Sequence, residues 1–193
     1  PVVCDFKNAH AISLAAEKEG IIIKGYIAVD TGMGRIGCFP DEAAPLAKEI
    51  SEQNILKLAG TITHFAVSDS ITTENQEFTK KQYNDFVQAI ENIKKEGINP
   101  GIRTCSSSAA LFAFPEMQMD MVRPGIVIYG YYPDEITKDF LQNKGIDVDL
   151  KTGKISYNSN PTKQLKCTSV YLLRHGRTQA TVDHKFMSET SEN

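Results

Sequence analysis

The stretch Ala28-Val29-Asp30-Thr31-Gly32-Met33-Gly34-Arg35-Ile36-Gly37 decides the fold class. The apolar run from Tyr26 to Val29 predicts a buried strand, which Asp30-Thr31-Gly32 ends. Three glycines then let the backbone turn sharply around a single cation, Arg35. A strand that ends in such a turn is typical of the loops at the working face of an α/β fold. The alternative is a plain tight turn whose Arg35 lies in solvent, because glycines mark turns far more often than sites.

The rest of the chain alternates between strand and helix signals. A capping box at Thr73-Glu74-Asn75-Gln76 predicts the start of the longest helix. A repeat of about 30 to 40 residues per strand–helix unit favours a parallel sheet with right-handed crossovers. An open doubly wound sheet and a closed barrel share this repeat, so periodicity leaves both open. Strands are predicted at residues 1–4, 21–29, 58–63, 102–104, 119–122 and 126–129, and helices at 8–18, 40–53, 73–97 and from 106.

Composition limits the classes of function. The chain has 193 residues, is 41% hydrophobic and carries a net charge of −3, which argues against nucleic-acid or anionic-membrane partners. No apolar run approaches the roughly 20 residues that span a bilayer, and no leader pattern is present. The cysteines are scattered without a Cys-x-x-Cys pair, so neither a metal site nor a disulfide framework is expected. Reduced thiols in the cytoplasm are the prediction.

Two further stretches follow the glycine-rich turn in the chain. Thr63-His64-Phe65-Ala66 and Val122-Arg123-Pro124-Gly125-Ile126 come in that order. Together with Asp30-Thr31-Gly32-Met33-Gly34-Arg35-Ile36-Gly37, they resemble the signature of alanine racemases, and the resemblance covers Pro1 to Lys151. It favours the closed barrel: an α/β fold that is a partial (β/α)₈ TIM barrel, like the alanine racemase N-terminal domain. Such a barrel needs roughly 250 residues, so we expect it to be incomplete at both ends.

The resemblance implies a bound pyridoxal 5′-phosphate, and Arg123 matches the arginine that hydrogen-bonds its pyridine nitrogen. A guanidinium keeps its proton, so the ring nitrogen stays unprotonated and the ring is a weaker electron sink. His64 matches the histidine that hydrogen-bonds this arginine and supports its orientation. Without the family match, Arg123 is an ordinary arginine that closes a strand end, and His64 is a satisfied core residue.

The phosphate of the cofactor has its own implied contacts. Ser108 matches the phosphate-binding serine, and Gly125 and Ile126 match residues that offer backbone N–H groups to the same phosphate. Simple N-capping by Ser108 explains its local sequence equally well. Arg35 matches the arginine that contacts the phenolic oxygen of the cofactor and orients the substrate carboxylate. Arg35, His64 and Arg123 are therefore the candidate catalytic residues, and no metal ligands are predicted.

The chain also departs from the family pattern. Ala28 stands where many members have a lysine, often carbamylated, that helps to hold the arginine, and Ser107 stands where asparagine is common. The catalytic lysine has no counterpart, and the opposing tyrosine belongs to a C-terminal domain across a dimer interface. Two-base racemisation needs a group on each face of the α-carbon. We therefore expect the parent protein to be a cytoplasmic bacterial homodimer that interconverts L- and D-alanine for peptidoglycan, and this chain alone not to racemise.

Two alternatives to that function remain open. One is a non-catalytic barrel fragment that binds pyridoxal phosphate or phosphate, and the other is a racemase that acts on serine or other amino acids. Residues 152–193 are expected to be a linker and an unrelated or disordered tail. Within them, Val170–Thr178, with its Arg174-His175-Gly176, resembles the opening motif of histidine phosphatases such as phosphoglycerate mutases. A start on Pro1 and this change near Lys151 are expected for a fragment joined to another gene by fusion, frameshift or assembly error.

Overall fold

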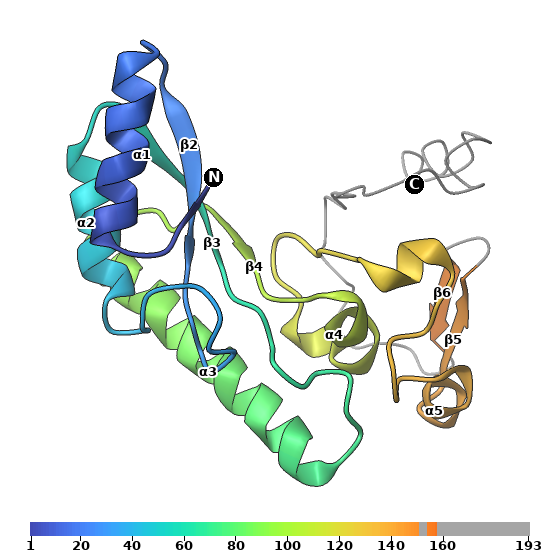
Figure 1. The fold of residues 1–193 in the computed structure, drawn as a ribbon. Helices are drawn as coiled ribbons and strands as arrows, with labels where there is room; N and C mark the ends of the chain where they lie inside the picture. The colour runs from blue at the N-terminus through green and yellow to red at the C-terminus, as the bar shows by residue number, and fades with distance from the viewer. Residues whose placement is uncertain (151–153, 158–193) are drawn as a thin grey trace.

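The computed structural model describes residues 1–150 and 154–157. A parallel sheet of four strands forms its centre, in the order β1-β2-β3-β4. Figure 1 shows helices α1, α2 and α3 on one side of this sheet. Spatial order equals chain order, as in a (β/α)₈ barrel, whereas a doubly wound sheet reverses its order at the switch point. The partial barrel is therefore confirmed. The strands are β1 (Val2–Val3), β2 (Ile23–Ala28), β3 (Leu56–Ile62) and β4 (Ile102–Thr104).

The strand register brings three chain segments to one edge of the sheet. Ala28 pairs with Ile62, and Ile62 pairs with Thr104, so the last residues of β2, β3 and β4 lie level. Gly60 makes this pairing possible, because a Cβ atom there would lie 2.2 Å from the carbonyl oxygen of Ile102. The loops that follow these strands therefore start side by side at the carboxyl edge.

Local signals set the ends of the helices. Helix α1 (Phe6–Lys18) starts where Asp5 accepts a hydrogen bond from the Asn8 amide at 2.6 Å. It is followed by α2 (Ala43–Glu52) and by α3 (Thr73–Lys95). The predicted capping position of α3 was wrong by one residue, because the Thr72 hydroxyl accepts from the Asn75 amide and Thr72 is the N-cap.

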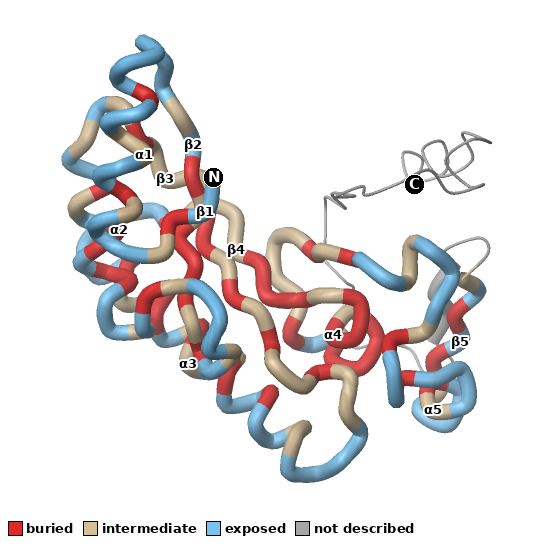
Figure 2. Tube along the Cα trace, viewed as in Figure 1, coloured by how far each residue is buried: buried red, intermediate tan, exposed pale blue. Residues whose placement is uncertain are grey.

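The hydrophobic core lies between the sheet and the three long helices. In Figure 2 the buried residues follow β2 and β3 and the helix faces turned toward them. Burial of these side chains is the main stabilising term for the half-barrel. The largest fully buried side chains of this layer are Ile27, Leu46, Ile50, Leu56, Phe86, Ile90 and Ile93.

After β4 the regular alternation stops. Residues 126–129, predicted as a strand, form the 3₁₀ helix η2 (Ile126–Tyr129), closed by hydrogen bonds from Ile128 to Gly125 and from Gly130 to Val127. A short apolar run does not distinguish a strand from a helical turn. Residues 119–122, also predicted as a strand, run beside β4 as irregular backbone held by Asp120–Arg103 hydrogen bonds. The remaining elements are α4 (Ser108–Ala113), the 3₁₀ helix η1 (Pro115–Met117), α5 (Lys138–Asn143), β5 (Ile146–Asp149) and β6 (Lys154–Tyr157).

The hairpin of β5 and β6 is antiparallel and crosses the boundary that the sequence places at residue 151. The division into residues 1–151 and 152–193 stays a prediction. The stretch Val170–Thr178 lies outside the described residues. Among the helices of the described part, none is long and apolar enough to cross a bilayer.

Candidate active site

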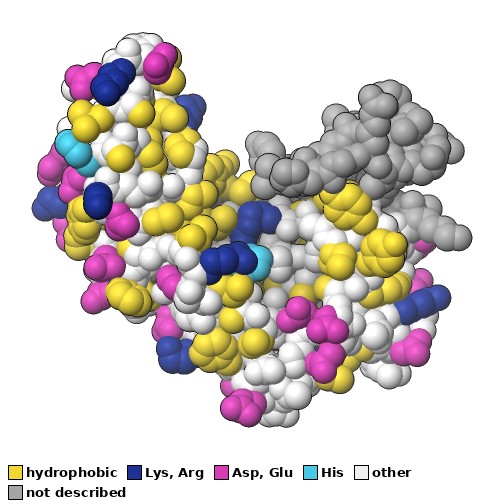
Figure 3. Space-filling model, viewed as in Figure 1, with side chains coloured by type: hydrophobic (Ala, Val, Ile, Leu, Met, Phe, Trp, Pro, Cys, Tyr) yellow, Lys and Arg dark blue, Asp and Glu magenta, His cyan; other side chains and the backbone are white. Residues whose placement is uncertain are grey.

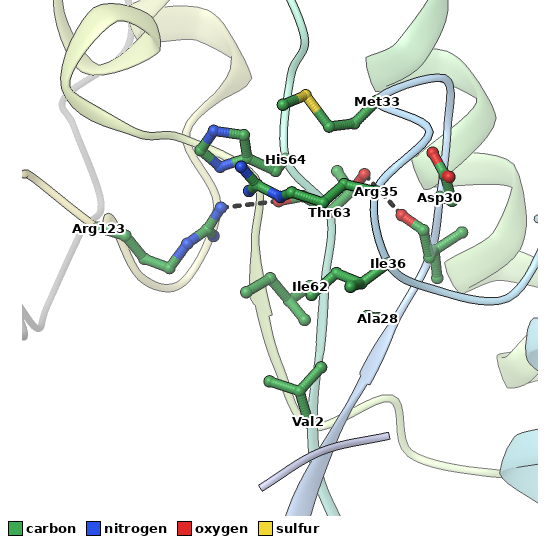
Figure 4. Close-up of a pocket in the computed structure, with 11 residues that line it drawn as sticks. Val2, Ala28, Asp30, Met33, Arg35, Ile36, Ile62, Thr63, His64 and Arg123 are labelled. Carbon is green, nitrogen blue, oxygen red and sulfur yellow. Dashed lines mark hydrogen bonds between the residues drawn. The ribbon is translucent and has the colours of Figure 1, made fainter. Parts of the chain in front are cut away.

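A cleft opens at the carboxyl edge of the sheet, where ligands bind in parallel α/β folds. It contains all three candidate catalytic residues. Figure 4 shows that Arg35, His64 and Arg123 point toward one another across it, and in Figure 3 basic side chains gather beside a histidine in the middle of the face. The cleft is lined by Val2, Ala28, Val29, Asp30, Met33, Arg35, Ile36, Ile62, Thr63, His64 and Arg123.

The loop that carries Arg35 is closed into a ring by main-chain hydrogen bonds. The Asp30 amide donates to the Cys38 carbonyl at 2.8 Å, and the Cys38 amide donates to the Ala28 carbonyl at 3.0 Å. Gly37 permits this closure, with φ of +125° and an ideal Cβ position only 2.7 Å from the Asp30 nitrogen. The sharp turn expected from the three glycines is therefore present, and it follows directly from the end of β2.

Within that ring, the Asp30 carboxylate supports the backbone rather than Arg35. Its Oδ1 accepts from the Gly32 amide at 2.9 Å and from the Gly34 amide at 3.0 Å. Arg35 is exposed at the rim, and its guanidinium donates no hydrogen bond to any residue of 1–150 or 154–157. The neighbouring Ala28 is too small to hold it. Arg35 is thus a cation that remains available to a ligand.

Arg123 is held in a different way. Its Nη2 donates to the Thr63 carbonyl at 2.7 Å, and its Nη1 donates to the Thr104 hydroxyl at 2.6 Å. Burial lowers the pKa of the Arg123 guanidinium to about 10, which still leaves it protonated at neutral pH. The ends of β3 and β4 therefore fix one permanent cation in the cleft.

His64 lies between the two arginines. Burial, and then the positive charges of Arg123 and Arg35, lower the pKa of His64, so the imidazole is neutral at pH 7. The expected hydrogen bond from His64 to Arg123 is not formed among the described residues. The backbone carbonyl of Thr63, one residue earlier in the chain, takes that place. His64 therefore lies beside Arg123 as a neutral neighbour.

The predicted phosphate contacts also come together. The Gly125 amide donates to Ser108 Oγ at 2.7 Å, and the Arg123 amide donates to the Ser106 carbonyl at 2.9 Å. These two bonds join the loop after β4 to the loop that carries Arg123. The N-cap of α4 is Ser107, so the N-capping alternative for Ser108 was wrong by one residue. Ile126 follows directly as the exposed first residue of η2.

The hydrogen-bond donors of Arg123, Ser108 and Gly125 fit a ligand whose aromatic ring accepts one hydrogen bond and carries a phosphate. Arg123 is a fixed guanidinium that cannot become an acceptor at neutral pH, which suits an unprotonated ring nitrogen. Ser108 and Gly125 each lie two residues after the hydrogen-bonded pair Ser106 and Arg123 that joins the two loops. Their small side chains allow an anion to approach the backbone. Among the residues that line the cleft there is no lysine, so the described residues supply reversible contacts rather than a covalent anchor.

Sequence reasoning missed the buried polar group beneath the cleft. Thr31, Thr63 and Gln82 are linked by hydrogen bonds, and Gln82 is fully buried in α3. The sequence does contain an indication of this group, because Gln82 is a polar residue four positions before Phe86 on the apolar face of α3. A polar residue on such a stripe requires a partner.

The cysteines described by the structure are free. Burial raises the pKa of the Cys38 thiol to about 12 and that of the Cys105 thiol to about 11, so both stay protonated and unreactive. Within the described residues no group of side chains could hold a metal ion. Cys167 lies outside them.

The strand order and the basic cleft at the carboxyl edge define a protein of the (β/α)₈-barrel class, present here as a partial barrel. The family model "Alanine racemase, N-terminal domain" matches residues 1–133. The chain belongs to the alanine racemase family, whose members are isomerases.

Individual relatives agree with this assignment. The alanine racemase of Treponema denticola is 42% identical over 146 residues, which cover 76% of this chain and 38% of the relative. That of Clostridium novyi is 40% identical over 156 residues, covering 80% and 39%. The structure of alanine racemase from Clostridium difficile 630 matches with a TM-score of 0.65 at 33% identity, covering 72% of this chain and 36% of that one. The chain thus spans less than half the length of these relatives.

Proposed function

We propose that this chain carries the ring-nitrogen and phosphate contacts of a pyridoxal-phosphate site in an alanine racemase. The activity proposed for the whole protein is the interconversion of L- and D-alanine, which supplies D-alanine for peptidoglycan in the bacterial cytoplasm. The observation that carries this proposal is the clamp on Arg123, because a half-buried guanidinium held by Thr63 and Thr104 is prepared for one fixed acceptor.

Each residue has a separate task in this proposal. When bound, pyridoxal phosphate supplies an electron-withdrawing ring that acidifies the α-proton of an amino acid. Arg123 donates to the ring nitrogen without giving up its proton, which keeps the withdrawal of electrons moderate. Ser108, with the Gly125 and Ile126 amides, binds the phosphate and fixes the ring in the cleft. Arg35 binds the substrate carboxylate through its planar pair of donors.

The remaining contributions come from His64 and from the apolar residues of the cleft. A neutral His64 does not compete with an anionic ligand for the arginines, and it accepts a proton only as the pH falls. The pyridine ring of the cofactor would pack on an apolar surface formed by Val2, Ile36 and Ile62. Proton transfer on both faces of the α-carbon requires a lysine and a tyrosine that are not among the cleft residues. A second subunit is the proposed source of the tyrosine.

Titration with pyridoxal phosphate, followed by its absorbance and by equilibrium dialysis, tests the proposal. We expect saturable binding that Arg123→Met weakens by about 30- to 100-fold, since a hydrogen bond to a charged group contributes about 2 to 3 kcal/mol. Arg103→Lys is the matched control, because Arg103 pairs with Asp120 and does not line the cleft. Equal affinity in Arg123→Met and Arg103→Lys would overturn the assignment.

A reversible, non-catalytic binding domain is the second candidate, and it is favoured for this chain alone because none of the described residues that line the cleft is a lysine. Borohydride reduction of the loaded chain, followed by peptide mapping, separates the two candidates. The second candidate predicts no specific lysine adduct and no turnover of L-alanine. One specific adduct together with turnover shows that the chain supplies its own base. Preference for L-serine over L-alanine in a racemising form of the protein would favour the broader substrate range.

A further inference from the structure

We propose that Gln82, buried in α3 behind the sheet, is a positioning residue: a one-way chain of hydrogen bonds by way of Thr31 holds Thr63, whose main-chain carbonyl accepts from Arg123. The proposal rests on the function proposed above only for the ligand that Arg123 receives. The chain of hydrogen bonds itself is a property of the protein without any ligand.

The direction of the chain follows from its last acceptor. Thr63 Oγ1 lies 2.8 Å from the Val29 carbonyl oxygen, which can only accept, so the Thr63 hydroxyl donates there. The 2.9 Å contact between Thr31 Oγ1 and Thr63 Oγ1 must then be a donation from Thr31. Each hydroxyl has one proton, so Thr31 has none left and can only accept from its other neighbour.

That neighbour is Gln82, and its amide has only one possible orientation. Gln82 Oε1 accepts from the Ala66 amide at 2.9 Å, which places the NH₂ group on the other side. Gln82 Nε2 lies 3.4 Å from Thr31 Oγ1 and donates to it. The protons therefore point from Gln82 to Thr31, from Thr31 to Thr63, and from Thr63 to Val29.

This chain of hydrogen bonds supports both walls of the cleft, namely the loop that carries Arg35 and the strand ends that hold Arg123. Thr31 lies within the glycine-rich ring that carries Arg35. Thr63 offers the carbonyl that accepts from Arg123 Nη2, and it directly precedes His64. Gln82 is 0% exposed, Thr63 3% and Thr31 6%, so water does not replace a missing partner without rearrangement. A change at Gln82 therefore reaches Arg123 without touching the cleft.

Two near-isosteric substitutions interrupt the chain at different points. Gln82→Met removes the donor to Thr31, and Thr31→Val removes the hydroxyl that passes the interaction on to Thr63. Because both act through one chain, their effects must not add. Thr31→Ser keeps the hydroxyl and should restore the chain. Thr79→Val is the matched control, since Thr79 is a fully buried hydroxyl on the same helix that bonds only to Asn75 within α3.

The first measurement needs no cofactor. The ¹H–¹⁵N signal of the Arg123 side chain reports how firmly its guanidinium is held. We expect slow exchange of its protons with solvent in the unaltered chain, in Thr31→Ser and in Thr79→Val. Exchange at least tenfold faster is expected in Gln82→Met and in Thr31→Val. Unchanged exchange in these two variants would overturn the proposal.

The second measurement is the dissociation constant for pyridoxal phosphate. Gln82→Met and Thr31→Val should each raise it about tenfold, and the double variant should also raise it about tenfold rather than a hundredfold. A hundredfold rise of the dissociation constant in the double variant would contradict the proposal that both residues act through one chain of hydrogen bonds. If the unaltered chain binds no pyridoxal phosphate, the proposed function fails, while the exchange measurement still decides the role of Gln82.

Discussion

The two arginines of the cleft differ in everything but their charge. Arg123 is half-buried, fixed by a carbonyl and a hydroxyl from the ends of two strands, and, in our proposal, supported from behind by a buried hydrogen-bond chain. Arg35 lies exposed at the rim on a ring of main-chain hydrogen bonds, and its guanidinium has no hydrogen bond to the described residues. One donor is held by the protein itself, whereas the other is left for a ligand to hold.

Under the proposed function, this difference suits the two arginines to different kinds of ligand. A donor that is already fixed loses little entropy on binding, so it suits a group that stays in place through many turnovers. A mobile donor suits a carboxylate that enters and leaves. The comparison predicts that damage to the Arg123 wall weakens cofactor binding, and that damage to the Arg35 wall leaves cofactor binding nearly intact.

The largest expected effect comes from breaking the Arg35 ring. Gly37→Ala places a methyl group against the Asp30 nitrogen and the Ala28 carbonyl at a φ of +125°, which should cost about 2 to 4 kcal/mol of unfolding free energy. Urea unfolding measures this loss. Gly34→Ala is the control, because its φ is +68° and no atom lies within 4 Å of the added methyl group, so about 1 kcal/mol is expected. Equal losses would mean that closure of the ring does not depend on Gly37.

The next effect tests the wall that carries Arg123. Ser108→Ala removes the acceptor of the Gly125 amide and one donor to the phosphate, so the dissociation constant for pyridoxal phosphate should rise about tenfold, or about 1.4 kcal/mol. Affinity for pyridoxal, which lacks the phosphate, should not change. Ser107→Ala is the control, since the Ser107 side chain makes no capping hydrogen bond. A similar loss for pyridoxal would place Ser108 away from the phosphate.

A smaller effect concerns the histidine between the walls. The pKa of His64 in the folded chain lies below its ordinary value of 6.5, so between these two values the unfolded chain binds more protons. Stability should therefore fall as the pH drops through about 6.5, and should level off below the folded pKa. His64→Gln should remove this part of the pH dependence in urea titrations from pH 7.5 to 5. An unchanged slope would mean that His64 titrates as it does in the unfolded chain.

The smallest effect is expected from Arg35→Ala. An exposed side chain without hydrogen bonds to the described residues should change the unfolding free energy by less than about 0.5 kcal/mol and cofactor affinity by less than about threefold. Its positive charge lowers the pKa of His64, so its removal should raise that pKa, as measured by NMR. A large loss of cofactor affinity would show that both arginines belong to the cofactor site.

The sequence was sufficient for the parts of the molecule that follow from local patterning. The apolar runs before Asp30 and His64 and the glycine at position 97 gave the strands and helix ends of the half-barrel. The shared register of β2, β3 and β4 then explains why Arg35 and His64, which are 29 positions apart in the sequence, reach one cleft. The family motifs added Arg123, whose position depends on an irregular loop.

Other features depend on atoms that a sequence does not distinguish. The group that holds Arg123 is the main-chain carbonyl of Thr63, which any residue at that position would possess. Residues 126–129 have the composition of a strand but form a helical turn, which the Ile128 and Gly130 amides close by donating to the Gly125 and Val127 carbonyls. The role of Gln82 depends on the direction of protons along three contacts, which only the arrangement in space defines.

The ring that carries Arg35 closes mainly through main-chain atoms, and the Asp30 carboxylate and the Cys38 thiol are the side-chain groups that add to the closure. Met33 and Ile36 extend from this ring into the cleft lining. Under the proposed function, these two side chains are therefore the positions at which a substitution would change substrate preference without altering the main chain that presents them.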